Sequence, residues 1–196
     1  DRTILIKELT LALSEINKTK YQQETGLMYL LLGDVLLKDG EIDKANNYFD
    51  KSFKLIKGKF IAADYYLRKS SIDIIRQDYL SSKSNLLKGL ESFKEKDIFT
   101  YPLYLNKLGY TSIMLKDYKN AKNYLLQSLY YQEKNGFSNL TSDTYLKLYY
   151  LAKSQDDISL QKDYLKKAIV SNQGDIYTLK DIYLGYNDFY SKTGDI

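Results

Sequence analysis

Hydrophobic residues recur along the chain with the spacing of an α-helix. The clearest runs are Leu27, Leu30, Leu31, Val35 and Leu37, and then Tyr104, Leu105, Leu108 and Leu115. Because a helix turns once every 3.6 residues, such spacing places the apolar side chains on one face. The chain has one proline and ten glycines, too few for a β-fold that needs turn residues about every 8 to 12 positions. The pattern therefore predicts an all-α protein of amphipathic helices joined by short polar breaks.

The helical pattern also repeats. Two segments align without a gap: GLMYLLLGDVLLKDGEIDKANNYFDKS, which begins at Gly26, and PLYLNKLGYTSIMLKDYKNAKNYLLQS, which begins at Pro102. Both have a Leu-Gly pair in a first helix, then an alanine and a large apolar residue in a second helix. These residues are Leu32, Gly33, Ala45 and Phe49 in one segment, and Leu108, Gly109, Ala121 and Leu125 in the other. Small residues at these positions allow two helices to cross closely.

Two further copies are less regular. The copy between the two good segments has Ser70 at the glycine position and Ser82 at the alanine position. In the last copy Tyr149 replaces the small residue and Gln161 replaces the alanine, so we expect a looser helix crossing there. The glycine-position landmarks recur at intervals of 37 to 40 residues: Gly33, Ser70, Gly109, Tyr149 and Asn187.

These motifs resemble the tetratricopeptide (TPR) signature. The resemblance implies a right-handed α-α superhelix, a TPR-like solenoid of antiparallel helix pairs. We predict a single array over residues 1–196, composed of a partial repeat (1–25), four repeats (about 26–59, 63–96, 102–135 and 142–175) and a second partial repeat (178–196). The partial repeats look like interior ones, so we expect a longer native protein and possible self-association through the exposed repeat ends.

In such a stack the first helix of every pair lines a concave groove. The resemblance therefore implies a set of partner-binding residues: Asp64, Leu67, Ser71, Asn106, Tyr110, Ile113, Asp143, Leu146, Tyr150 and Lys153. Their mixture of aliphatic, tyrosine and charged side chains suits an amphipathic helix or an extended peptide. The competing interpretation is that individual leucines and isoleucines of this set are core residues, and that the 21 tyrosines reflect overall composition rather than recognition.

The amino-acid composition argues against many other functions. The chain has no cysteine and no histidine, so the usual nucleophiles, general bases and transition-metal ligands are missing. We find no glycine-rich phosphate loop, and we predict no enzyme activity, no cofactor and no metal. The net charge of +4 comes from lysines interspersed with acids, with only three arginines, which argues against nucleic acid as a partner. No apolar run is long enough to insert into a membrane, and the compartment stays open.

Three functional hypotheses follow. The first is a scaffold that binds a protein or peptide, as the sensory or interaction segment of a larger bacterial signalling or regulatory protein; this role is implied by the TPR resemblance. The second is a peptide-pheromone-type receptor domain of a transcriptional regulator, which would need groove asparagines such as Asn106 to hold peptide backbone. The third, an enzyme, would have to work with lysine, tyrosine and carboxylates alone. We favour the binding scaffold.

Overall fold

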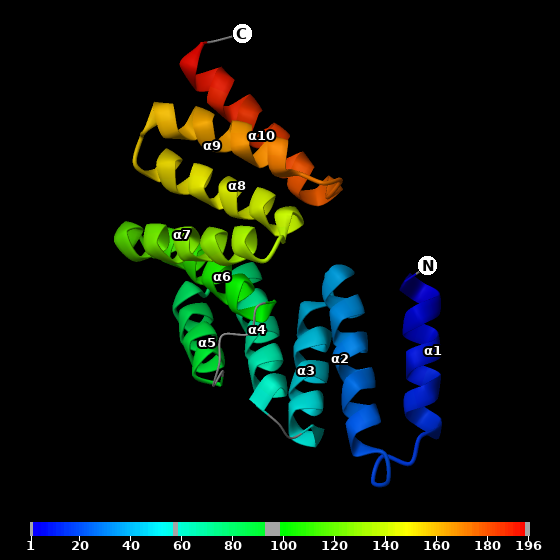
Figure 1. Ribbon diagram of the computed structural model, residues 1–196. Coiled ribbons are helices and arrows are strands. Elements are labelled where there is room, and N and C mark those ends of the chain that lie inside the picture. Colours follow the sequence, from blue (N-terminus) through cyan, green and yellow to red (C-terminus); the bar gives the residue numbers. More distant parts are fainter. Residues whose placement is uncertain (1, 57–58, 93–98, 195–196) are drawn as a thin grey trace. The chain divides into compact units, whose positions relative to one another are not determined.

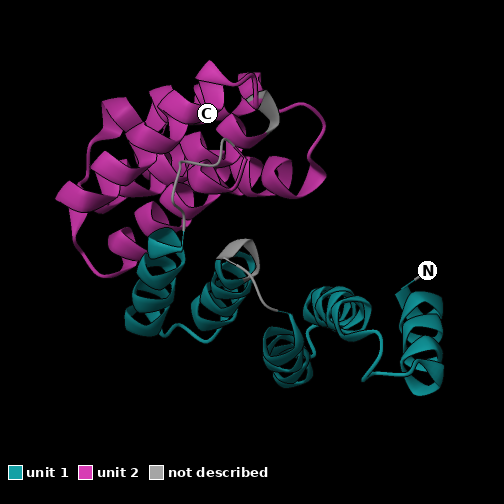
Figure 2. Ribbon diagram, turned by 60° about the horizontal axis from the view of Figure 1, so that its bottom comes forward, with its two compact units in different colours: residues 1–94 teal, residues 95–196 magenta. Residues whose placement is uncertain are grey.

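The computed structural model describes residues 2–56, 59–92 and 99–194, and in these residues the chain forms ten α-helices and no strand. The all-α prediction is therefore confirmed. The chain divides into two compact units, residues 1–94 and 95–196 (Figures 1 and 2). Each unit is described by itself below, and the single continuous array stays a prediction. Residues 57–58 and 93–98, which fall near the ends of two predicted repeats, lie outside the described residues.

Unit 1 consists, in its described part, of an initial helix and two helix pairs. The helices are α1 (Arg2–Glu15), α2 (Gln22–Lys38), α3 (Ile42–Leu55), α4 (Lys59–Ile75) and α5 (Tyr79–Glu91). The pairs α2–α3 and α4–α5 pack extensively. Each pair begins four residues before the predicted start of its repeat (26–59 and 63–96) and ends inside that repeat. A short turn joins the two helices of each pair, so they run antiparallel (Figure 1).

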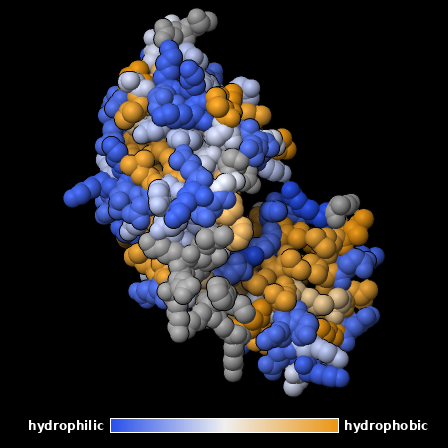
Figure 3. All heavy atoms as spheres, in the orientation of Figure 1, coloured by the Kyte–Doolittle hydropathy of each residue, from blue (hydrophilic) through white to orange (hydrophobic). Residues whose placement is uncertain are grey.

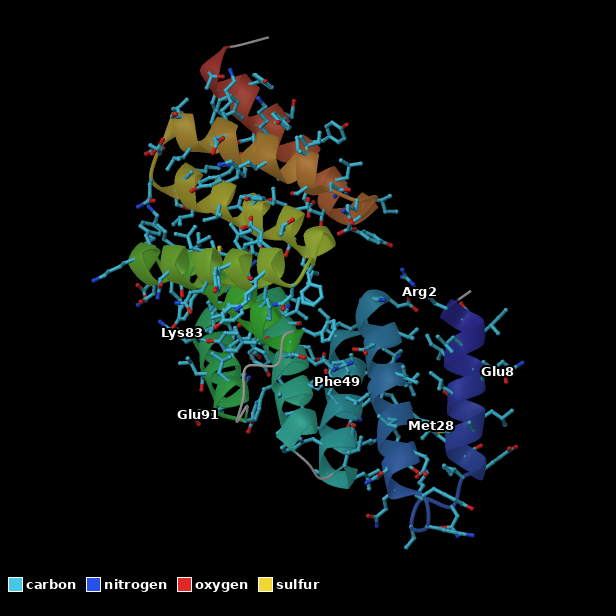
Figure 4. All side chains as sticks on the ribbon, in the orientation of Figure 1. Arg2, Glu8, Met28, Phe49, Lys83 and Glu91 are labelled. Atoms are coloured by element: carbon cyan, nitrogen blue, oxygen red, sulfur yellow. The ribbon has the colours of Figure 1, made fainter. Side chains whose placement is uncertain are left out.

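The first helix is less tightly held than the others in unit 1. Its contact with α2 is much smaller than the contact between α2 and α3. Met28 packs partly buried against the core cluster and lies between α1 and α2, whereas Glu8 points away from them (Figure 4). Arg2 reaches from α1 to the end of α2, where its Nη1 lies 3.0 Å from a carboxylate oxygen of Asp39.

Unit 2 contains two helix pairs and a final helix in the residues that are described. The helices are α6 (Thr100–Met114), α7 (Tyr118–Lys134), α8 (Ser138–Ser154), α9 (Ile158–Ser171) and α10 (Ile176–Thr193). The pairs are α6–α7 and α8–α9, and α10 packs on both α8 and α9. The first helices also contact one another, α6 with α8 and α8 with α10, whereas α7 and α9 have no comparable contact in this part of the chain. The first helices thus form a continuous layer, as expected for the inner layer of a helical-repeat stack.

The predicted close crossings are confirmed at both Leu-Gly pairs. A Cβ placed on Gly33 would lie 2.4 Å from the ring of Phe49, and one on Gly109 would lie 2.4 Å from Cγ of Leu125. Both Phe49 and Leu125 are fully buried, and Phe49 lies among the side chains between neighbouring helices (Figure 4). Since carbon atoms normally approach to about 3.5–4.0 Å, only glycine allows these helices to lie so close.

The expected looser crossing between α8 and α9 is wrong, because their contact is as extensive as that between α6 and α7. Tyr149 is fully buried. Its ring packs against Gly185 of α10, and a Cβ placed on Gly185 would lie only 3.1 Å from Cε1 of Tyr149. Its hydroxyl lies 3.2 Å from the backbone oxygen of Gly185 and 3.1 Å from a carboxylate oxygen of Asp188. The glycine that Tyr149 replaces is thus compensated by a glycine on the next helix.

The turns inside the pairs α4–α5, α6–α7 and α8–α9 share one construction. Gln77, Lys116 and Asp156 have positive φ angles of 61°, 60° and 55°, a conformation that costs a non-glycine residue about 1 kcal/mol or more. An aspartate follows each of them and caps the next helix; Asp117, for example, accepts a hydrogen bond from the backbone N–H of Asn120. Such caps satisfy backbone donors that the first helical turn leaves without partners. Three residues are therefore enough to end one helix and start the next in each of these pairs.

Candidate partner-binding face

Two stripes of side chains on neighbouring helices of unit 2 form the candidate site. They follow the spacing i, i+4, i+7 and i+11, which keeps them on one side of a helix. We call them the α6/α8 face: Leu103, Lys107, Tyr110 and Met114 on α6, and Asp143, Lys147, Tyr150 and Ser154 on α8. All eight side chains are partly or fully exposed. The two helices contact each other directly, so the stripes are neighbours.

Four of the residues predicted to bind a partner lie on or beside this face. Tyr110, Asp143 and Tyr150 belong to the face itself, and Lys153 follows Tyr150 on α8 and is partly exposed. Three other predicted residues are buried instead: Asn106 (5% exposed), Ile113 (5%) and Leu146 (3%). Ile113 and Leu146 belong to hydrophobic core clusters of unit 2, as the competing interpretation of such aliphatic residues expects.

Asn106 is part of a buried polar network. Its side-chain amide donates to the hydroxyl oxygen of Thr144 at 2.7 Å, and that oxygen lies 3.1 Å from Oε1 of Gln132. The amide of Gln132 donates to the hydroxyl of Ser128 at 3.0 Å, and Ser128 donates to the backbone oxygen of Pro102 at 2.8 Å. The network joins α6, α7 and α8. The structure therefore uses Asn106 to hold helices together.

The charges of the α6/α8 face are unevenly paired. Lys147 forms an ion pair with Asp143, one turn earlier on the same helix. Lys107 makes no hydrogen bond or ion pair within the described part of the chain. Its pKa is lowered to about 8, first by burial and then by the positive charge of Lys147, while Asp143 acts in the opposite direction. Neither lysine belonged to the predicted set, although the i, i+4, i+7 pattern of Leu103, Lys107 and Tyr110 is visible in the sequence.

Tyr150 of the face remains protonated at neutral pH. The pKa of Tyr150 is raised to about 12, mainly by burial and further by the charge of Asp181 on α10, with Tyr110 and Asp143 adding to the effect. A protonated phenol offers apolar surface together with a hydrogen-bond donor, a combination common in recognition surfaces. Beside the face, Nζ of Lys153 lies 2.8 Å from a carboxylate oxygen of Asp188.

The predicted residues of unit 1 lie on α4. Asp64, Leu67 and Ser71 are all partly exposed, and the hydroxyl of Ser71 donates to the backbone oxygen of Leu67 at 3.0 Å. Asp64 forms an ion pair with Arg68, whose guanidinium also forms a two-point contact with Asp34 of α2, with distances of 2.8 and 2.7 Å. A two-point contact of this kind fixes both partners. The charge of Arg68 is therefore neutralised within unit 1.

Unit 1 also exposes large apolar side chains: Ile4, Leu5 and Leu11 of α1 and Leu27 and Leu31 of α2 are each 47–60% exposed. Figure 3 shows hydrophobic side chains gathered over this part of unit 1. Self-association through such side chains stays a prediction.

A hollow of about 560 Å³ lies between α7, α8 and α9 of unit 2. Three of its four charged side chains have partners: the hydroxyl of Tyr145 donates to Glu133 at 3.2 Å, and Lys167 lies 2.7 Å from Asp163. The fourth, Lys166, is exposed to solvent. Among the described residues, no group of three acidic side chains is placed to hold a metal ion, and no helix has the length and apolar character needed to cross a membrane. The α6/α8 face, where the charge without a partner belongs to the partly buried Lys107, is the stronger candidate.

The sequence matches no family model and no curated protein. Solved structures do resemble the fold. The chain is similar to the crystal structure of BtubC (BKLC) from P. vanneervenii, with a TM-score of 0.77 and 13% identity over 99% of this chain and 85% of that chain. It is also similar to the apo form of RapI, with a TM-score of 0.76 and 17% identity over 97% of this chain and 84% of that chain.

A third similar structure is the APC/C hetero-tetramer Cut9–Hcn1, with a TM-score of 0.65 and 16% identity over 82% of this chain and 30% of that chain. At these identities the likeness shows a shared fold. The fold is a TPR-like solenoid of helix pairs, as the sequence motifs predict.

Proposed function

We propose that this chain is a non-catalytic scaffold that binds a protein or peptide segment on the α6/α8 face. The observation on which the proposal rests is the pair of partly buried tyrosines, Tyr110 and Tyr150, at equivalent positions of two helices in contact. Each has a charged residue one turn before it, Lys107 and Lys147. An extended or helical peptide lying across the two helices would cover the tyrosine rings and reach the charges.

We further propose that binding serves a sensory or interaction role in a larger bacterial signalling or regulatory protein. The support is the resemblance of the Lys-, Tyr- and Asn-rich repeats to bacterial TPR arrays of this kind. The alternative, a peptide-pheromone-type receptor, required groove asparagines that hold peptide backbone. Asn106 is 5% exposed and its amide donates to Thr144, so the interaction scaffold is the better-supported proposal.

The test is a binding comparison between matched tyrosine variants. Partners are captured from the source cells with the wild-type chain, with Tyr110→Ala/Tyr150→Ala, and with Tyr130→Ala, which alters a 58% exposed tyrosine on α7. We expect the double variant to lose a partner that the wild type and Tyr130→Ala retain, with unchanged far-ultraviolet circular dichroism. A partner held equally by all three chains, or lost only by Tyr130→Ala, would move the site away from the α6/α8 face.

A further inference from the structure

Repeats on both sides of α6 neutralise a basic side chain on the first helix in the same way. In α4 the basic residue is Arg68, and Asp64 lies four residues before it; in α8 the basic residue is Lys147, and Asp143 lies four residues before it. Both pairs form ion pairs. Residues four apart on a helix lie one above the other on the same side, so the acid is built into the position that faces the base.

The equivalent pair in α6 lacks its acid. Lys107 occupies the basic position, but the residue four before it is Leu103. In the described part of unit 2, the one carboxylate whose charge favours protonated Lys107 is Asp143, which is already paired with Lys147. Two partly buried ammonium groups on neighbouring helices therefore share one carboxylate. A partly buried charge without a partner costs free energy in the unbound protein, and an incoming anion would remove this cost.

The surroundings favour a carboxylate attached to a peptide. Tyr110 lies one turn after Lys107 and Tyr150 one turn after Lys147, so apolar surface and phenol hydroxyls lie beside the surplus charge. The charge of Asp181 on α10 raises the pKa of Tyr150 and has no such effect on Lys107. A bare anion could use the charge and the hydroxyls but not the apolar area of the two rings, whereas a peptide with an acidic residue would use all of them.

We propose, building on the binding function proposed above, that Lys107 is a specificity residue that pairs with a carboxylate of the bound peptide while Tyr110 and Tyr150 cover its neighbouring residues. The carboxylate belongs either to an aspartate or glutamate side chain or to the C-terminus of the peptide, because both groups offer the same two oxygens. Lys147 remains paired with Asp143 and adds attraction at longer range. Hydrogen bonds between charged groups are among the stronger ones in proteins.

The experiment is a selection of binders from a display library of random twelve-residue peptides. The baits are the wild-type chain, Lys107→Met and Lys122→Met, the last a control at an exposed lysine of α7. We expect wild type and Lys122→Met to select peptides with an acid at a fixed distance from hydrophobic or aromatic residues, and Lys107→Met to keep the apolar preference without the acid. A wild-type selection without enrichment of Asp, Glu or a terminal carboxylate would overturn this inference and leave the binding function intact. Failure to enrich any peptide would overturn both.

Synthetic versions of one selected peptide identify the source of the carboxylate. A change of its Glu to Gln tests the side chain, and amidation tests the C-terminus; the change that weakens binding to wild type roughly 10- to 100-fold, as expected for loss of a charge-assisted hydrogen bond, identifies the group. The same change should have little effect on binding to Lys107→Met. Equal losses in both chains would show that the carboxylate binds elsewhere.

A second variant tests the missing acid itself. Leu103→Glu supplies the carboxylate that α4 and α8 already have, and Leu103→Gln is its uncharged control. We expect Leu103→Glu to raise the pKa of Lys107, measured from the Cε resonance of labelled lysine, and to weaken the acidic peptide roughly 10-fold or more, while Leu103→Gln retains the affinity. Lys107→Arg should retain the binding that Lys107→Met removes. If Leu103→Glu and Leu103→Gln weaken the peptide equally, the surplus charge does not select it.

Discussion

The crossing of α6 and α7 makes a quantitative prediction for Gly109→Ala. The added Cβ would lie 2.4 Å from Cγ and 2.5 Å from Cδ2 of Leu125, far inside ordinary contact. Leu125 is fully buried and has no free space to enter. Overpacking of this severity costs about 3 kcal/mol, and the better helix propensity of alanine returns about 1 kcal/mol. We expect Gly109→Ala to lower the free energy of unfolding by about 2 kcal/mol.

A double-mutant cycle shows whether Leu125 is the cause. Leu125→Ala alone should cost about 3 kcal/mol through the lost apolar contacts and the cavity. In the double variant the methyl group added at position 109 occupies part of that cavity, so the clash disappears and only the gain in helix propensity remains. The double variant should therefore be about as stable as Gly109→Ala, about 2 kcal/mol below wild type. Additive effects of the two single changes would instead give a loss of about 5 kcal/mol.

The assay is urea unfolding followed by circular dichroism at 222 nm, with hydrogen exchange at the α6 and α7 amides to assign the change to unit 2. Leu126→Ala is the matched control, because Leu126 is the next residue on α7 and 44% exposed. It should cost under about 1 kcal/mol and add to Gly109→Ala. A stabilising Gly109→Ala, or an additive cycle with Leu125→Ala, would refute the close crossing on which the repeat assignment depends.

Three further outcomes follow from the structure. Asn106→Ala should cost about 2 kcal/mol in urea unfolding, because it leaves buried polar groups without a partner, whereas the exposed Asn123→Ala should change little; equal effects would contradict the buried network. Lys116→Gly should stabilise by about 1 kcal/mol because its φ is 60°. Lys122→Gly, at an exposed position further inside α7, should destabilise by a similar amount; a destabilising Lys116→Gly would contradict the turn geometry. The pKa of Lys107 in the folded chain is about 8, so between about pH 8 and 9.5 the unfolded chain binds more protons at Lys107 than the folded chain. The free energy of unfolding should therefore rise with pH in this range, and Lys107→Met should remove that rise. Parallel pH profiles of the two chains would contradict the burial of an unpaired lysine.

Much of the fold could be predicted because the repeat itself constrains it. Gly33 and Gly109 mark positions where a side chain cannot fit, and the buried Ala45 and Ala121 mark the partner helix. Such residues repeat because the geometry of a crossing repeats. The crossing at Tyr149 could not be predicted this way, because its compensation, Gly185, lies on the next helix of the stack and outside the motif.

The binding face was harder to predict for a different reason. Each first helix contacts its own partner and its neighbours in the stack, so most of its circumference is buried. A shift of one residue then decides whether a side chain is core or surface, as Asn106 and Lys107 show: the first is 5% exposed and the second lies on the α6/α8 face. Hydrophobicity does not settle this point, since the buried residue here is polar. The missing acid at Leu103 could be recognised only once the ion pairs of α4 and α8 were known.

Site-specific photo-crosslinking in the source cells tests directly whether a partner binds on the α6/α8 face. The photoreactive residue p-benzoylphenylalanine replaces Tyr110 or Tyr150 on the α6/α8 face, and Leu126 or Tyr130 on α7 in two control chains. If the partner binds on the α6/α8 face, one partner should crosslink at positions 110 and 150 and not at 126 or 130, and Lys107→Met should reduce both crosslinks. Crosslinks at 126 or 130 with none at 110 and 150 would contradict binding on this face.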